Sequence, residues 1–533
     1  MTTYYVDYNR GSDSNAGTSM SAPWKHWTKI DDAAKSAGDV ILFANDSVWE
    51  YDLSTRVTPP TSWVGTQTKP VVIGKYSPLS AGTGNPTVRW NTKIAAGDWT
   101  YSAPNNCWQY TSPLDPGAQC LVRLGNTWAA SRIDGTQLPL ASVDGRYSAS
   151  GTTFSLYAPA GTNPTDYYGE VLLSSQKGFL ALSSGRNCID VEDIDFEYTC
   201  AGIVAYSGTA ADVRFNLRRI GGRFVSVPIY AISDSPGQLF LSIKDCNFTE
   251  WGSAAIHVLT NGGAGMKQVE ISGNTITNGL HCFAQGAIYI QTRGTGLVTR
   301  VHDNHISGVR WGSRDKIYDG CGIYVETGAD VVEVYRNTIY DAGCAMQDNS
   351  GRGSKWFSNL VYDCKTAMRV SDQSDRNAMA HEFYNNTCIV GVDKSAYSEF
   401  GVQPSEAGWR CYRPTGTITS LLVKNNVFVN QGATQAAAIL TPEVTPSSTS
   451  YINNAASGGY TSIAARELTP FTVEISTGAV TADPLLSATY RPLQGSPLLS
   501  AGTFISYASR DINGVQRPNP PSIGAYDVAT MRT

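Results

Sequence analysis

The chain has 533 residues, which is enough for three or four ordinary globular domains or for one long repetitive domain. Lys and Arg number 40 against 45 Asp and Glu, so the formal net charge is −5 and a nucleic-acid-binding protein, which needs a basic face, is disfavoured. Charged residues are only 16% while Gly (51), Tyr (28) and Trp (12) are abundant, so we expect an all-β extracellular or virion protein. The 41% apolar content excludes global disorder.

No run of 18 apolar residues is present, so we expect no membrane helix and no membrane insertion. The start, Met1 to Asp7, has neither a basic nor an apolar segment of the signal-peptide kind. We therefore expect either that a leader was removed or that the protein leaves its cell by another route, such as release in a phage particle. The 11 cysteines lack zinc-binding spacing and are expected to be mainly buried free thiols.

The N-terminal region predicts a cap for a longer β structure. Apolar residues at helical spacing predict a short amphipathic helix over 28–37, with Thr28 and Asp31 as its capping pair and Gly38 as its end. Short apolar strands follow at 40–43 and 71–73. The Trp, Tyr, Pro and Gly-rich stretch after them breaks the pattern and predicts an inserted small β-domain.

An internal repeat dominates the middle of the chain. Six segments share the pattern apolar-x-x-Asn-x-apolar, and their asparagines are Asn274, Asn304, Asn337, Asn359, Asn386 and Asn426. Successive asparagines are 30, 33, 22, 27 and 40 residues apart. The shortest spacing, roughly 22 residues, is about one turn of a parallel β-helix, and longer spacings place insertions in loops. We expect each Asn to stand at a corner and to hydrogen-bond to the Asn of the next turn.

These patterns predict four segments. We expect the cap and first strands over 1–92, the inserted β-rich subdomain over 93–175, the central parallel β-helix over 176–430, and the last turns and a closing tail over 431–533.

Both ends of the chain resemble a known group of proteins. The opening Tyr4-Tyr-Val-Asp7, Gly11-Ser-Asp13 and Pro23-Trp24, and the close Gly495-Ser-Pro-Leu-Leu-Ser-Ala-Gly502 and Ile523-Gly-Ala-Tyr526, are similar to those of bacterial and phage right-handed parallel β-helix proteins of the pectin-lyase-like superfamily. The resemblance covers nearly the whole chain. It implies an all-β right-handed parallel β-helix and a link to polysaccharide lyases, glycoside hydrolases, phage tailspike depolymerases or non-catalytic members. No catalytic motif of one family can be carried over, so the site is predicted from local residues.

Strand alternation predicts which side chains of the repeat face outward. Stacking the strands in register gives one outward column, formed by Val204, Tyr230, His257, Tyr289, Tyr324, Gln347 and Arg369. Neighbouring turns lie about 4.8 Å apart, so the column is long enough for several sugar rings. Its exposed aromatic rings would suit the apolar faces of pyranoses, and Arg369 would suit an acidic sugar. We therefore predict that His257, Tyr289, Tyr324, Gln347 and Arg369 bind substrate.

Three carboxylates near this column are the predicted catalytic residues. They are Glu326, Asp348 and Asp319, and glycoside hydrolysis needs such a pair about 5 Å or about 6.5–9.5 Å apart. The neighbouring charged loop adds Arg310, Trp311 and Lys316 as predicted substrate-binding residues. The alternative role of each carboxylate is a turn cap or an ion pair.

β-Elimination from a uronate is the rival chemistry. A base such as His257, Tyr289, Tyr324 or Lys316 would remove the C5 proton, and Arg369 or Arg310 would neutralise the carboxylate. The acids could then bind Ca²⁺, although no EF-hand-type spacing is present. We expect no other cofactor and no metal for hydrolysis.

The sequence therefore predicts a protein that binds and depolymerises an extracellular or bacterial surface polysaccharide, with hydrolysis slightly favoured. A phage tail spike is the preferred setting, with a homotrimer implied by resemblance. The alternatives are a free bacterial polysaccharide lyase and a non-catalytic glycan-binding or structural virion protein.

Overall fold

The computed structural model packs the chain into two compact units. The first is Met1–Ala264 with Asn278–Ala284 and Gly312–Lys316, and the second is Gly265–Thr277, Gln285–Trp311 and Ile317–Thr533. The structure describes residues 1–32, 35–55, 57–59, 62–78, 82–113, 122–125, 127–128, 131–132, 146–174, 178–182, 185–207, 213–233, 239–260, 266–279, 286–291, 298–309, 321–326, 332–349, 354–371, 379–392, 408–412, 418–435, 437–441, 448–466, 472–474 and 476–527.

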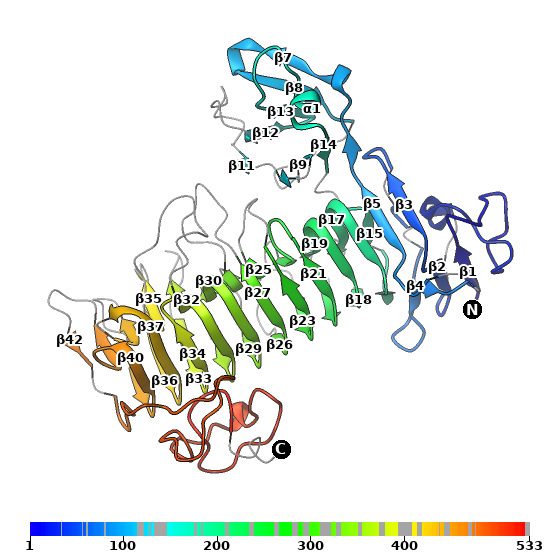
Figure 1. Cartoon of the computed structure of the whole chain (residues 1–533). Helices are drawn as coiled ribbons and strands as arrows, with labels where there is room; N and C mark the ends of the chain where they lie inside the picture. The colour runs from blue at the N-terminus through cyan, green and yellow to red at the C-terminus, as the bar shows by residue number, and fades with distance from the viewer. Residues whose placement is uncertain are drawn as a thin grey trace. The chain divides into compact units, whose positions relative to one another are not determined.

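The first unit contains two parallel sheets whose strands alternate along the chain (Figure 1). One sheet is formed by β1 (Thr3–Val6), β2 (Val40–Ala44), β4 (Val71–Tyr76), β16 (Ile189–Glu192), β18 (Val213–Arg218) and β20 (Leu239–Lys244). The other is formed by β3 (Val48–Tyr51), β5 (Thr87–Trp90), β15 (Leu180–Leu182), β17 (Asp195–Ser207), β19 (Gly221–Ser233), β21 (Asn247–Thr249) and β22 (Ile256–Thr260). Each turn of chain therefore adds a strand to one sheet and then to the other.

The second unit repeats this arrangement. Its first sheet is formed by β23 (Met266–Ser272), β26 (Val298–His302), β29 (Val332–Tyr335), β31 (Lys355–Phe357), β33 (Met379–Tyr384), β36 (Ile418–Lys424) and β39 (Ser448–Ile452). Its second is formed by β24 (Thr275–Thr277), β25 (Gly286–Gln291), β27 (His305–Val309), β28 (Cys321–Glu326), β30 (Thr338–Asp348), β32 (Leu360–Ser371), β34 (Thr387–Val390), β35 (Trp409–Tyr412), β37 (Val427–Gln435), β38 (Ile439–Thr441), β40 (Ala455–Tyr460) and β41 (Ala464–Arg466). Among the strands described in this unit, β42 (Thr472–Val473) alone pairs antiparallel, with β41.

Alternating side chains explain why these strands stack. In β18 the residues Val213, Phe215 and Leu217 are buried while the residues between them are partly exposed, and β16, β20 and β29 follow the same rule. The expected all-β class with parallel strands is confirmed, and the longest α-helix described is α1 (Pro164–Tyr168). No helix within the described ranges is long and apolar enough to cross a bilayer.

Antiparallel strands interrupt the first unit between β5 and β15. One small sheet has the order β10 (Thr127–Trp128), β9 (Val122–Leu124), β14 (Val171–Leu173) and β6 (Thr92–Lys93). The other has the order β11 (Ser131–Arg132), β12 (Arg146–Ser150), β13 (Thr153–Leu156), β8 (Cys107–Thr111) and β7 (Thr100–Ser102). These strands fall within the stretch where the sequence loses its repeat, while the predicted domain boundaries themselves stay predictions.

The N-terminal cap differs from the expected amphipathic helix over 28–37. A 3-10 helix spans Trp27–Asp32, and Ala33 and Ala34 lie outside the described residues. Trp27 and Ile30 are both fully buried, and Trp27 stacks on Phe43 with 3.7 Å between ring centroids. Residues three apart share one face of a 3-10 helix, so the two large side chains suffice to hold this tighter turn against the core.

The predicted asparagine ladder is confirmed in the second unit. Nδ2 of each Asn donates to Oδ1 of the next at 2.8–3.0 Å, through Asn274, Asn304, Asn337, Asn359, Asn386 and Asn426 to Asn454, which the sequence pattern missed. The left-handed backbone falls on the residue before each Asn, for example Asp303 (φ 56°) and Arg336 (φ 54°), rather than on the Asn itself. The asparagines are thus free to use extended geometry for the ladder.

Candidate functional site

The part of the predicted column that lies in the second unit has the expected register. Tyr289 of β25 pairs with Tyr324 of β28, Tyr324 with Gln347 of β30, Gln347 with Arg369 of β32, and Arg369 with Arg410 of β35. We call these five residues the polar column. Because neighbouring parallel strands lie about 4.8 Å apart, residues 22 to 41 positions apart in the sequence become adjacent.

The polar column is less exposed than the sequence suggested. Tyr289 and Tyr324 stack with 5.1 Å between centroids and an interplanar angle of 29°, and each side chain is only 3% exposed. In-register stacking turns the ring faces along the column, so the rings cover each other instead of facing solvent. The expectation of exposed aromatic faces is therefore wrong for this pair, although its adjacency was predicted.

A chain of side-chain hydrogen bonds joins the column to neighbouring residues. Asn349 Nδ2 donates to the Tyr324 hydroxyl oxygen at 2.7 Å, and Gln347 Nε2 donates to Asn349 Oδ1 at 3.3 Å. The thiol of Cys321 donates to Gln347 Oε1 at 3.1 Å. Cys321 was not predicted as part of a site because single cysteines were expected to act as small apolar residues. Asn349 was not among the residues predicted to bind substrate.

Two arginines, Arg369 and Arg410, come after Gln347 in the polar column. Arg369 and Arg410 occupy neighbouring strands and are 6% and 8% exposed. Burial alone would raise the pKa of the nearby Cys344 thiol, but a hydrogen bond with Cys321 and the positive charge of Arg369 bring it below its ordinary value of 9.0. This end of the column is therefore electropositive. Arg410, which the sequence column omitted, extends it.

The two described carboxylates among the predicted catalytic residues lie on opposite faces of the second sheet. Glu326 is two residues beyond Tyr324 on β28, so it shares the face of the polar column, and it is partly buried. Asp348 directly follows Gln347 and pairs in register with the core residues Val325 and Val370. The rule that places Gln347 outside therefore places Asp348 inside.

The interior position of Asp348 is fully occupied by other contacts. Its carboxylate accepts hydrogen bonds from His381 Nδ1 at 2.9 Å, from Trp356 Nε1 at 3.3 Å, and from the Ser354 hydroxyl. Asp348 is fully buried. The expected convergence of Asp348 with Glu326 is therefore not found, and Asp348 has a structural role.

The remaining predicted residues are not part of the polar column as described. Asp319, Arg310, Trp311 and Lys316 lie outside the described residues. His257 belongs to the first unit, where it pairs in register with Tyr230 and lies 4.8 Å from its ring. His257 is buried, and desolvation lowers its pKa from 6.5 to about 3, so it stays neutral at physiological pH.

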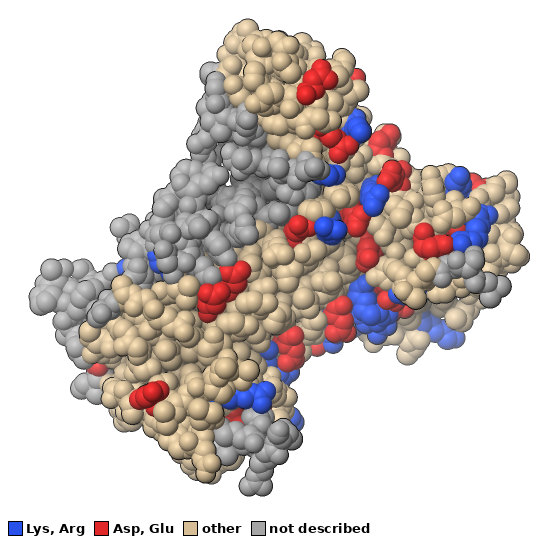
Figure 2. Space-filling model, viewed as in Figure 1, with Lys and Arg blue, Asp and Glu red and all other residues tan. Residues whose placement is uncertain are grey.

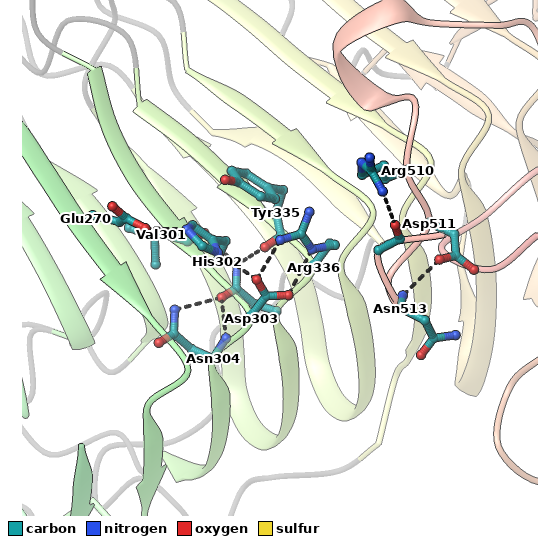
Figure 3. A network of polar contacts seen from close by, with 12 residues as sticks. Glu270, Val301, His302, Asp303, Asn304, Tyr335, Arg336, Arg510, Asp511 and Asn513 are labelled. Carbon is teal, nitrogen blue, oxygen red and sulfur yellow. Dashed lines mark hydrogen bonds and ion pairs between the residues drawn. The ribbon is translucent and has the colours of Figure 1, made fainter. Parts of the chain in front are cut away.

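A second polar network of the second unit lies on its first sheet (Figure 3). His302 Nδ1 contacts Asp303 at 2.6 Å, and Arg336 donates to both oxygens of Asp303 at 2.8 and 2.6 Å. Burial opposes ionisation of Asp303, but Arg336 and His302 outweigh it and hold the pKa of this carboxyl well below its usual range. His302 also stacks on Tyr335 with 4.7 Å between centroids. These charges satisfy one another, so we assign the network to stability.

The polar column is the arrangement of the second unit that we consider for a ligand, and its five residues are 3–8% exposed. It combines aromatic edges, an amide and two guanidinium groups with one carboxylate, Glu326, on the same face. No group of three His, Cys, Asp or Glu side chains that could hold a metal occurs among the described residues. The arrangement can bind an acidic ligand and can position one carboxylate or phenol beside it.

Comparison with known proteins gives limited similarity. No protein-family model matches the chain. A lacto-N-biosidase of Bifidobacterium longum subsp. longum is 35% identical over 92 residues, which are 17% of this chain and 5% of that protein, so the chain matches about a twentieth of this curated relative. The structure of XylC in complex with xylose is similar over 99% of this chain and 98% of XylC, at 13% identity and a TM-score of 0.49. A GH136 lacto-N-biosidase from Eubacterium ramulus matches over 90% of this chain and 68% of its own, at 11% identity and a TM-score of 0.43.

Proposed function

We propose that this protein is carbohydrate-active and binds and depolymerises an extracellular or bacterial surface polysaccharide. The observation that carries the proposal is the polar column, in which Tyr324, Gln347 and Arg369 stand in register on adjacent strands. A regular row of hydrogen-bonding and cationic side chains at about 4.8 Å spacing suits a polymer with repeated hydroxyl and carboxylate groups. The 92-residue similarity to a lacto-N-biosidase supports the same ligand class.

Hydrolysis is the first candidate reaction. Glu326 shares the face of the polar column and would serve as one of the two carboxylates that glycoside hydrolysis requires. Asp348 is removed from this role because it lies in the core. Asp319 stays the proposed partner, and the reaction depends on its reaching the same face as Glu326.

β-Elimination is the second candidate, and one observation favours it. Arg369 and Arg410 lie on neighbouring strands and place two positive charges together, which would neutralise the carboxylate of a uronate and so acidify its C5 proton. Tyr324, two strands from Arg369, would take that proton as its phenolate while the C4–O bond of the uronate breaks and a C4=C5 double bond forms, and the resulting phenol would protonate the departing glycosidic oxygen. Calcium stays an expectation, and no step is routed through it.

The reactions separate in one assay. The protein is incubated with polygalacturonate and with neutral polysaccharides, and new reducing ends and unsaturated-uronate absorbance are followed. New reducing ends without absorbance support hydrolysis, and both signals support elimination. Retained binding without either signal supports the alternative of a non-catalytic glycan-binding or structural virion protein. Glu326→Gln would abolish hydrolysis, whereas elimination through Tyr324 would survive it.

The wider setting belongs to the same proposal. We propose a right-handed parallel β-helix of the pectin-lyase-like kind, located outside the cell or in a phage tail and assembled as a homotrimer. A free bacterial enzyme is the alternative setting. Light scattering of the purified full chain tests the trimer, because a monomer would argue against the tail-spike assembly.

A further inference from the structure

A hollow of about 420 Å³ lies on the outer face of the second sheet of the first unit. Gly221 of β19 stands in register between Asp195 of β17 and Asn247 of β21. A Cβ atom at Gly221 would lie 2.1 Å from Asp195 Oδ1, far inside contact distance. The absence of a side chain at Gly221 therefore lets the Asp195 carboxyl group lie directly over this residue, in the wall of the hollow, with the Asn247 amide on the other side.

The arginines around the hollow are paired with carboxylates. Arg219 contacts Asp193 at 2.7 Å, and Arg223 contacts Glu250 at 3.1 Å. Arg89, which lies beside the hollow, donates to Glu197 at 3.0 Å. Figure 2 shows acidic and basic side chains next to one another over β5, β17 and β19. The cations of the hollow are thus already engaged by protein groups.

The hydrogen-bond partners of Asp195 are uncharged, although the positive charge of Lys75 also acts on this carboxyl group. Its Oδ1 accepts a hydrogen bond from Asn85 Nδ2 at 2.9 Å, and the backbone N–H of Gly221 also donates to it. Burial raises the pKa of Asp195, and the negative charge of Glu197 adds to this effect. Asp193, Glu197 and Asp245 line the same hollow. The hollow therefore offers an excess of hydrogen-bond acceptors and repels anions.

We propose that this hollow binds a neutral sugar residue through its hydroxyl groups. Hydroxyls donate hydrogen bonds to carboxylate oxygens and accept them from amides, so Asp195 and Asn247 on either side of Gly221 would hold two of them. A uronate would be excluded by the surrounding carboxylates. The proposed function supplies only the ligand class, and this site is additional to the polar column of the second unit.

The test uses the full-length chain and saturation-transfer-difference NMR with glucose, galactose, N-acetylglucosamine and galacturonate, each added separately. Gly221→Ala forces the Asp195 carboxyl group out of its place over Gly221, and Asp195→Asn changes this acceptor while keeping its shape. Gly97→Ala is the matched control, because a Cβ there meets nothing within 4 Å. The same titrations in an Arg369→Met background separate this site from the polar column.

We expect at least one neutral sugar to bind the unchanged protein, the Gly97→Ala variant and the Arg369→Met variant. Its affinity should fall at least tenfold in both Gly221→Ala and Asp195→Asn, and galacturonate should show no binding that depends on Gly221. Absence of neutral-sugar binding, unchanged affinity in the two variants, or stronger Gly221-dependent binding of galacturonate would each overturn the proposal. Failure of the proposed function would instead appear as no cleavage of any polysaccharide, and would leave Gly221-dependent binding in place.

Discussion

The asparagine ladder and the polar column of the second unit are built by the same stacking rule but differ in composition. In the ladder every position is Asn, and each amide satisfies the next at 2.8–3.0 Å. In the polar column the residue type changes from Tyr to Gln to Arg. Identical Asn side chains can satisfy one another by hydrogen bonds from each turn to the next. Pairing between identical side chains does not explain a column in which the residue type changes. The uniform column therefore has a structural explanation, and recognition is what we propose for the varied column.

Replacement of Asp348, the buried residue next to Gln347 of the polar column, should give the largest loss of stability. Asp348→Ala removes the acceptor of His381, Trp356 and Ser354, so the free energy of unfolding should fall by about 4 kcal/mol. Chemical denaturation followed by tryptophan fluorescence measures the change. Asp166→Ala on an exposed segment is the control, and equal stability of the two variants would contradict the interior assignment of Asp348.

Replacement of one asparagine of the ladder should lower the free energy of unfolding slightly less than Asp348→Ala does. Asn359 accepts from Asn337 Nδ2 and donates to Asn386 and to the Val334 carbonyl. Asn359→Ala leaves buried groups unsatisfied and should lower the free energy of unfolding by about 3 kcal/mol. The exposed Asn513→Ala serves as the control. A ladder variant as stable as this control would show that the asparagines do not support one another.

The first unit should respond to pH through His257. Its pKa in the folded protein is about 3 against an ordinary 6.5, so below pH 6.5 the unfolded chain binds a proton that the folded chain does not. Stability should therefore fall as the pH falls from 6.5, by about 2 kcal/mol at pH 5. His257→Phe keeps a ring against Tyr230 and should remove this part of the pH dependence. Identical pH profiles of the free energy of unfolding would contradict the assignment.

The smallest effect is expected within the polar column itself. Tyr289→Leu removes the stack on Tyr324 and should lower the free energy of unfolding by about 1 kcal/mol. The melting temperature measures the change, with Tyr167→Leu at an exposed tyrosine as the control. A loss as large as that of Asn359→Ala would show that the column serves mainly for stability.

The sequence predicted adjacency better than it predicted exposure. The spacing of the repeat was enough to bring Tyr289, Tyr324, Gln347 and Arg369 into register, because each turn ends at a recognisable Asn. The burial of these side chains depends on contacts between different turns, which the pattern of one strand does not contain. The position of Asp348 could have been predicted, since it directly follows the outward-facing Gln347.

The first-unit hollow could not be found in the same way. Asp195 and Glu197 are separated from the repeat that was used to set the register, and the signal for the hollow is a missing side chain at Gly221. A glycine in a strand has several explanations in a sequence, including a bulge or a weak strand. Its meaning appears only when Asp195 and Asn247 are seen on either side.

The central claim is that the polar column binds and turns over the polysaccharide, and Arg369→Met tests it most directly. The measurement is kcat/KM for depolymerisation of polygalacturonate, with Arg300→Met on the first sheet as the matched control. We predict at least a 100-fold loss for Arg369→Met, which corresponds to about 2.7 kcal/mol of transition-state stabilisation, and less than a twofold change for Arg300→Met. Full activity of a folded Arg369→Met protein would contradict the account.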